Sequence, residues 1–319
     1  MKRRSPTPAW GAAWSAALSV ARPVLLSAAL WCASLPSHAA CPPAGETTAT
    51  LQSLKAAKWQ RADLQTEAPR QALAWALLDC LAEPDPQLRD ALAFEALQAW
   101  MRGGLLTPPT LQLLRTRLLA ALAAPADAVG YTQPFSALVL AEVARVDRMQ
   151  PWMSAEERQA LVDGAARYLA GVRDYRGFDE RDGWRHGVAH GADLLLQLSL
   201  NPQLQRAQAE ALLAALAVQV MPPGSQAWRY GEPGRLAAPV FYLARRELLT
   251  AEDWQRWFEA LTARLDKGAA GRNTQAGLAQ RHNLGAFLTE LYTTVQESPS
   301  AEAKAHLLPG LRKALRDMD

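Results

Sequence analysis

Apolar residues recur at intervals of three and four along nearly the whole chain after residue 47, which is the spacing of one face of an α-helix. Alanine, leucine, glutamine, arginine and glutamate dominate, whereas runs of β-branched residues are nearly absent. Short breaks containing Pro or Gly separate the periodic segments. The pattern predicts an all-α protein with helices near residues 48–60, 69–82, 86–101, 108–123, 133–146, 155–172, 183–199, 203–219, 234–247, 251–265, 274–295 and 301–317.

Several helix starts carry their own signals. Ser154 is followed three residues later by Glu157, which is the pattern of a capping box. Thr250 is expected to cap the helix that follows it, and Asp182 is expected to cap the helix at 183–199.

Paired helices with short connections predict an α/α helical-repeat array, either a degenerate HEAT-like solenoid or a curved helical array of about eleven or twelve helices. No strict repeat is present, so any repetition is structural. No linker rich in Gly, Ser or Pro divides the chain, and residues 40–319 are therefore expected to form a single α-helical domain.

Residues 1–39 have the pattern of a cleaved signal peptide. Three basic residues at positions 2–4 precede an apolar stretch at 24–35, and small residues follow before the expected cleavage site. This predicts a periplasmic or secreted protein. His38 stands where a lipidation signal usually has leucine, so a lipoprotein anchored at Cys41 is not expected.

Removal of this leader changes the charge of the chain. The leader holds four basic residues and no acidic one, which leaves 30 basic against 31 acidic residues. The balance does not call for nucleic acid or an anionic membrane surface as partner. No later segment reaches the ~18 uninterrupted apolar residues of a membrane span, so no transmembrane segment is expected after the leader.

Two cysteines remain in the mature chain, Cys41 and Cys80. An oxidising compartment favours a disulfide between them. The alternative is two free thiols, with Cys80 buried on the apolar face of its helix. The sequence leaves both possibilities open.

The segment GWRHGVAHGAD, residues 183–193, carries the most informative side chains. On a helix, His186, His190 and Asp193 fall within about 60° of one another on a single face. Such a stripe can be a hydrogen-bonded structural network, a metal-free acid–base site, or a site for a divalent metal such as Zn or Mn. The glutamate that follows the first histidine in zincins is replaced here by Gly187.

Two other segments could converge on this stripe. Glu232 and Arg235 stand at a predicted helix start, where they are either a cap with a surface ion pair or catalytic groups. His282 and Asn283 lie on a predicted amphipathic helix. Either Glu232 or His282 would complete a metal site, and Asn283 would stand at the rim of a pocket.

The loop before the histidines, residues 174–184, is densely charged. A solvated surface turn accounts for it. The functional alternative is a pocket rim in which Asp174 and Arg176 form an orienting pair and Trp184 supplies an apolar wall.

Four segments resemble the bacterial domain of unknown function 2785 family, over roughly residues 130–295. They are PFSALVLAEV (134–143), DYRGFDERDGWRHGVAHGAD (174–193), the stretch 232–237 and NLGAFLTELY (283–292). The resemblance implies an all-helical fold, and it singles out the two histidines and Asp193. The family has no established activity, so function stays open.

Two functions therefore compete. The first is a binding or scaffold module of the cell envelope, whose concave face docks a peptide, glycan or partner protein. The second is a metal-dependent, hydrolase-like enzyme centred on His186, His190 and Asp193. Other catalytic templates are missing, since the chain has no Gly-x-Ser-x-Gly elbow, no Cys-x-x-Cys and no phosphate-binding Gly-rich loop. The enzyme hypothesis requires accessible imidazoles with a further acid or His282 a few ångströms away.

Overall fold

The computed structural model describes residues 41–318, and the predicted leader 1–39 lies outside the described residues. The described part is built from helices and one two-stranded hairpin. The all-α prediction is confirmed. No helix in this part of the chain combines the length and the apolar character needed to cross a bilayer.

The elements up to the centre of the chain include two 3₁₀ helices, η1 and η2, and one π-helix, η3. They are α1 (Thr48–Ala56), η1 (Ala62–Gln65), α2 (Glu67–Ala76), η2 (Leu77–Ala82), η3 (Gln87–Phe94), α3 (Glu95–Arg102), α4 (Pro108–Ala123), α5 (Thr132–Met149) and α6 (Ala155–Gly171).

The remaining elements begin with the hairpin and end with two long helices. They are β1 (Phe178–Asp179), β2 (Gly183–Trp184), α7 (Gly187–Ser199), α8 (Arg206–Val220), α9 (Glu232–Ala244), α10 (Ala251–Thr262), the short α11 (Ala269–Asn273), α12 (Gln275–Glu297) and α13 (Ala301–Asp317).

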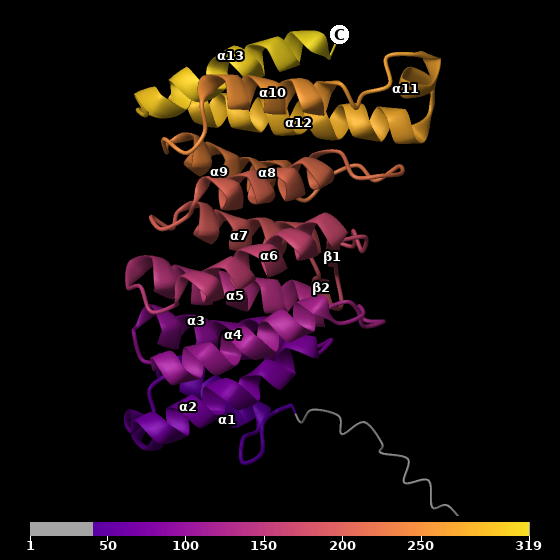
Figure 1. The fold of residues 1–319 in the computed structure, drawn as a ribbon. Helices are drawn as coiled ribbons and strands as arrows, with labels where there is room; N and C mark the ends of the chain where they lie inside the picture. The colour runs from indigo at the N-terminus through magenta and orange to yellow at the C-terminus, as the bar shows by residue number, and fades with distance from the viewer. Residues whose placement is uncertain (1–40, 319) are drawn as a thin grey trace, which may run out of the picture. The chain divides into compact units, whose positions relative to one another are not determined.

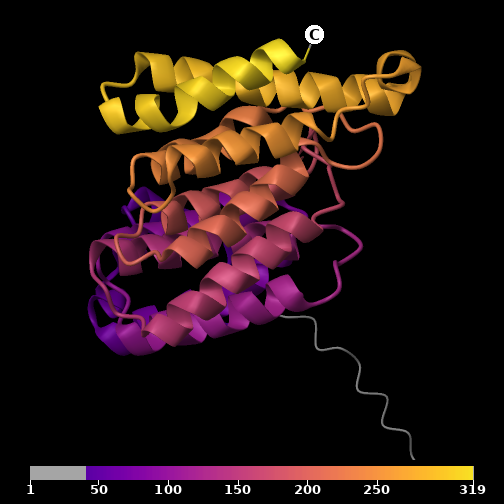
Figure 2. The same ribbon diagram turned by 45° about the horizontal axis from the view of Figure 1, so that its top comes forward.

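From α3 to α12 the helices form two layers (Figures 1 and 2). Helices α3, α5, α7, α9 and α12 pack side by side in one layer, and α4, α6 and α8 pack side by side in the other. Across the layers, α4 packs on α5, α6 on α7, and α8 on both α7 and α9. Their apolar faces meet in one continuous core.

Local capping chemistry fixes several helix starts as predicted. The Ser154 hydroxyl accepts from the Glu157 amide, and the Glu157 carboxylate accepts from the Ser154 amide, which completes a capping box. Thr250 forms the same arrangement with Asp253 at the start of α10. Both predicted caps are confirmed.

The helix predicted at 183–199 begins later than expected. Gly183 and Trp184 form β2, which pairs antiparallel with Phe178 and Asp179 of β1. His186 has a left-handed backbone with φ of 55°, so the helix starts after it, at Gly187. The predicted cap, Asp182, instead lies in the hairpin turn, where its amide donates to the Asp179 carboxylate at 3.0 Å.

Two features join segments that are separate in the sequence. Cys41 and Cys80 form a disulfide that joins the start of the described chain to η2. Farther along, the buried Asp147 at the end of α5 accepts hydrogen bonds from Arg158 of α6 and from Asn201. It also caps the amides of the α5–α6 connection at residues 152 and 153.

Candidate functional site

The first turns of α5, α7 and α9 meet at one place in the molecule. The Arg185 guanidinium, just before α7, lies 4.5 Å from the centre of the Tyr131 ring at the start of α5. On the other side, the His186 Nε2 lies 3.9 Å from the Glu232 Oε1 at the start of α9. The site therefore forms where three neighbouring helices begin.

Of the two predicted histidines, His186 directly precedes α7 and His190 lies in its first turn. Their ring centroids are 6.0 Å apart. The ring of His186 is stacked on that of Trp184, with centroids 4.6 Å apart, and the ring of His190 packs edge-on against Phe135 at 5.1 Å. In the described chain, His186 Nε2 and His190 Nδ1 are buried without a hydrogen-bond partner.

Burial governs the protonation of both imidazoles. Desolvation, with smaller contributions from the neighbouring His186 and Arg235, lowers the pKa of His190 to about 3. Desolvation also lowers the pKa of His186, although the Glu232 carboxylate opposes this shift. Both rings are therefore neutral at pH 7, the form in which each has a nitrogen able to accept a hydrogen bond.

The acidic groups of the site are already engaged. Glu232 is buried and accepts a hydrogen bond of 2.8 Å from the Tyr230 amide. Asp193 forms an ion pair with Arg235, whose Nη1 lies 2.6 Å from Oδ1. Burial raises the pKa of Asp193, and the Arg235 guanidinium counteracts part of that rise.

The predicted metal ligands are not brought together. Asp193 faces Arg235, while the His282 Nε2 lies 3.2 Å from the Trp228 carbonyl oxygen. Within residues 41–318, no group of three or more His, Cys, Asp or Glu side chains is placed to hold a metal ion. The side chains present thus do not fit the set of His186, His190, Asp193 and His282 that the sequence suggested.

Asn283 lies in the core and not at a pocket rim. Its side chain accepts from the Trp228 amide at 2.8 Å and donates to the Gln226 carbonyl at 2.7 Å. It therefore holds the α8–α9 connection against α12. This role positions the backbone on which Tyr230 and Glu232 stand.

An exposed aromatic patch lies beside His186. It consists of Phe178, Trp184 and Tyr230, which are 46%, 37% and 36% exposed. The Trp184 ring centroid lies 5.0 Å from that of Phe178 and 5.6 Å from that of Tyr230. The sequence interpretation found Trp184 but missed the other two, although an Asp-Gly turn flanked by aromatic residues is a hairpin signal.

A buried arginine holds the hairpin that carries two of the patch residues. Arg89 of η3 donates to the Asp182 carbonyl in the hairpin and to the carbonyls of Glu83 and Pro84. Its guanidinium carbon also lies 3.9 Å from the centre of the Tyr131 ring. Arg89 thus fixes the hairpin relative to the start of α5, a contact between distant segments that no local sequence pattern predicts.

Asp174 and Arg176 form the predicted pair. The Arg176 Nε lies 2.8 Å from Asp174 Oδ1, and the pair packs directly on Gly130. Asp174 lines a cavity of about 590 Å³ between α4 and α6. Arg176 lines a separate pocket of about 250 Å³ beside Phe178 and Tyr230. The pair therefore separates the cavity from the pocket.

The fold and site define an all-α protein with an aromatic patch beside two largely buried, neutral histidines. The chain belongs to the DUF2785 family, described as a protein of unknown function, since that family model matches residues 118–293, more than half of the chain. The family resemblance of the sequence motifs is confirmed. No curated protein and no solved structure matches the chain.

Proposed function

We propose that this chain is a helical-repeat binding protein of the cell envelope, and that the aromatic patch of Phe178, Trp184 and Tyr230 docks a peptide segment of a partner protein. Exposed apolar side chains that touch one another are a feature of interaction sites, whereas single exposed ones need no explanation. Here three aromatic rings are contiguous and about two-fifths exposed. This contiguity is the observation that carries the proposal.

The surroundings of the patch indicate the chemistry of the partner. The charged lining of the pocket of about 250 Å³ beside it consists of three arginines and one carboxylate: Arg176, Arg185, Arg229 and Asp179. Tryptophan, tyrosine and arginine are the residues most enriched in the energetic centres of protein interfaces. A peptide with an apolar side chain next to an acidic one suits this combination.

The rigidity of the patch also supports binding. Trp184 rests on His186, and Tyr230 packs on Gly177, where a β-carbon would come within 2.1 Å of its ring. Because these rings are held before any partner arrives, less conformational entropy is lost on association.

Two further features agree with a repeat architecture and with export. The regular succession of α3, α5, α7 and α9 in one layer, opposite α4, α6 and α8, is the packing expected of an α/α solenoid. A disulfide favours an oxidising compartment. It also occupies the Cys41 sulfur, on which a lipid anchor would be built.

A random peptide library displayed on phage tests the proposal. We expect enriched peptides with an aromatic or aliphatic residue beside Asp or Glu, and we expect Trp184→Ala to weaken their binding about 30-fold, as for a central interface residue. Calorimetry with a synthetic enriched peptide gives the dissociation constants. Trp75→Ala is the matched control, because Trp75 is also exposed but lies on α2.

Two results would reject the peptide proposal. One is a library that yields no peptide with saturable binding, and the other is a peptide that binds Trp184→Ala as tightly as the unaltered protein. A glycan array run in parallel would then show whether the same rings bind sugars instead.

A hydrolase-like enzyme is the second candidate, and the His186–Glu232 pair is the observation that favours it. A neutral imidazole 3.9 Å from a buried carboxylate is suited to general acid–base chemistry. The metal-dependent form of this candidate needs ligands that the described residues do not assemble.

Elemental analysis of the purified mature protein separates these forms. We expect no stoichiometric Zn, Mn or Fe, and no change in metal content in a His186→Ala/His190→Ala variant, because Asp193 is held by Arg235. One metal ion per chain that disappears in the double variant would contradict this expectation and would restore the metal-dependent enzyme.

A further inference from the structure

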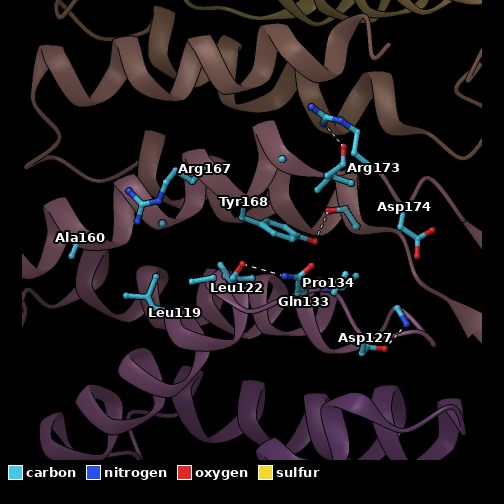
Figure 3. Close-up of a pocket in the computed structure, with 17 residues that line it drawn as sticks. Leu119, Leu122, Asp127, Gln133, Pro134, Ala160, Arg167, Tyr168, Arg173 and Asp174 are labelled. Atoms are coloured by element: carbon cyan, nitrogen blue, oxygen red, sulfur yellow. Dashed lines mark hydrogen bonds between the residues drawn. The ribbon is translucent and has the colours of Figure 1, made fainter. Parts of the chain in front are cut away.

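A cavity separate from the aromatic patch lies farther along the helices. It has a volume of about 590 Å³ and opens between α4, α6 and the segment before α5 (Figure 3). The cavity adjoins the histidine site at Gly187, the first residue of α7, whose carbonyl accepts a hydrogen bond of 3.2 Å from the Tyr168 hydroxyl in the cavity. The cavity therefore requires its own explanation.

Its shape is long and its lining is largely apolar. Along α6 the lining residues run from Ala160 to Gly171, a distance of about 16 Å at the rise of an α-helix. Leu119 and Leu122 face them from α4, and Figure 3 shows these side chains spread along the two helices. The volume falls in the range of small-molecule sites, and the length suits a linear molecule.

Most polar groups of the lining already have partners. The Asp127 carboxylate accepts from the amides of Gly130 and Thr132. Asp174 is paired with Arg176. Both acidic side chains are thus satisfied by the protein itself and do not repel a negatively charged ligand strongly.

The cationic side chains differ from these carboxylates. Arg173 donates to the carbonyls of Ala170 and Val172 but has no carboxylate partner among residues 41–318. Arg167 forms neither a hydrogen bond nor an ion pair within that range, and it stands at the rim of the cavity. The cavity therefore combines an apolar interior with unneutralised positive charge at its edge.

We propose that this cavity binds a medium-chain fatty acid, with the alkyl chain between α4 and α6 and the carboxylate at Arg167. Burial of the alkyl chain supplies most of the affinity, at about 25 cal/mol per Å² of apolar surface. The guanidinium selects the ionised head group, because an ammonium or an uncharged head would gain no ion pair there. This proposal does not depend on the peptide function of the aromatic patch.

Isothermal titration of the mature, disulfide-bonded protein with decanoate, below its micellar concentration, tests the proposal. We expect one site per chain. Arg167→Gln is expected to bind decanoate about fivefold more weakly, which is the effect of one exposed ion pair. Decanol, which lacks the charge, should show the same loss on the unaltered protein. Arg312→Gln, an exposed arginine of α13, is the matched control.

A second pair of variants locates the site. Ala160 lines the cavity and is exposed, so Ala160→Trp should fill the space without disturbing the core and should reduce decanoate affinity at least tenfold. Ala214→Trp, at an exposed position of α8, should have no effect. The absence of saturable heat, equal binding of decanol and decanoate, or unchanged binding by Ala160→Trp would each overturn the proposal.

Discussion

At the scale of the residue, the pKa of His190 reflects the burial of its side chain. Its ring packs against Phe135 and lies 6.0 Å from the ring of His186. Neither neighbour compensates the cost of charging it, so its pKa falls to about 3 through burial, with smaller contributions from His186 and Arg235. An imidazole that remains neutral in mildly acidic solution links protonation to folding.

This linkage predicts an acid-sensitive stability. In the unfolded chain the imidazole takes up a proton below its usual pKa of about 6.5, whereas in the folded chain it does not until about 3. The free energy of unfolding should therefore decrease as pH falls from 6.5 toward 3, by at most about 1.4 kcal/mol per pH unit from this group. Urea unfolding at a series of pH values measures the slope.

His190→Gln removes the titrating group and should flatten this part of the profile. His306→Gln serves as the control, since His306 lies on α13 and contacts the Ala244 carbonyl. If His190→Gln leaves the slope unchanged, the imidazole is solvated in the folded protein.

At the scale of elements, hydrogen bonds to Asp147 connect three segments that are separate in the sequence. It joins the end of α5 to α6 through Arg158 and to the α7–α8 connection through Asn201. Burial acts to raise its pKa, but Arg158 and the amides of residues 152 and 153 outweigh this effect and lower it. The carboxylate therefore stays ionised, and it stabilises these junctions.

We expect Asp147→Asn to destabilise the protein by about 3–5 kcal/mol, because it leaves the buried Arg158 guanidinium without a countercharge. Chemical unfolding gives the free energy. The double variant Asp147→Asn/Arg158→Met should recover much of the loss, since no buried charge remains. A single variant that costs less than about 1 kcal/mol would show that the pair is solvated.

Helices were more predictable than the connections between them. The start of α6 follows from the reciprocal bonding of Ser154 and Glu157, which lie three residues apart. The hairpin before α7 was missed because its causes are not local. Gly183 has a φ of 74°, and Arg89, almost a hundred residues earlier in the chain, holds the turn through the Asp182 carbonyl.

The candidate site was also predictable only in its local features. The helical spacing of His186 and His190 predicts that the two rings lie close together, and their centroids are 6.0 Å apart, with His186 directly before α7 and His190 in its first turn. Their surroundings were not predictable, because the pairing of Asp193 with Arg235 and of Asn283 with the Trp228 backbone depends on which helices become neighbours. Helical period identifies a face but not the partner of that face.

At the scale of the molecule, the disulfide is a covalent link between residues that are distant in the sequence. Cys41 and Cys80 are 39 residues apart, and closing a loop of this length removes about 4 kcal/mol of unfolded-state entropy. We expect Cys41→Ser/Cys80→Ser to lose about this much stability by urea unfolding. Reducing agent should lower the stability of the unaltered protein equally and leave the double variant unaffected. A loss well below 2 kcal/mol would mean that the crosslink constrains little.

The layered packing gives the disulfide a second consequence. A helix inside the array is gripped by neighbours on two sides, whereas the first and the last have a neighbour on one side only and fray more readily. The disulfide joins the first described residues covalently to η2. At the opposite end of the array, α13 is held by packing alone. Opening of the oxidised protein should thus start at its carboxyl-terminal end, and reduction should release a second starting point.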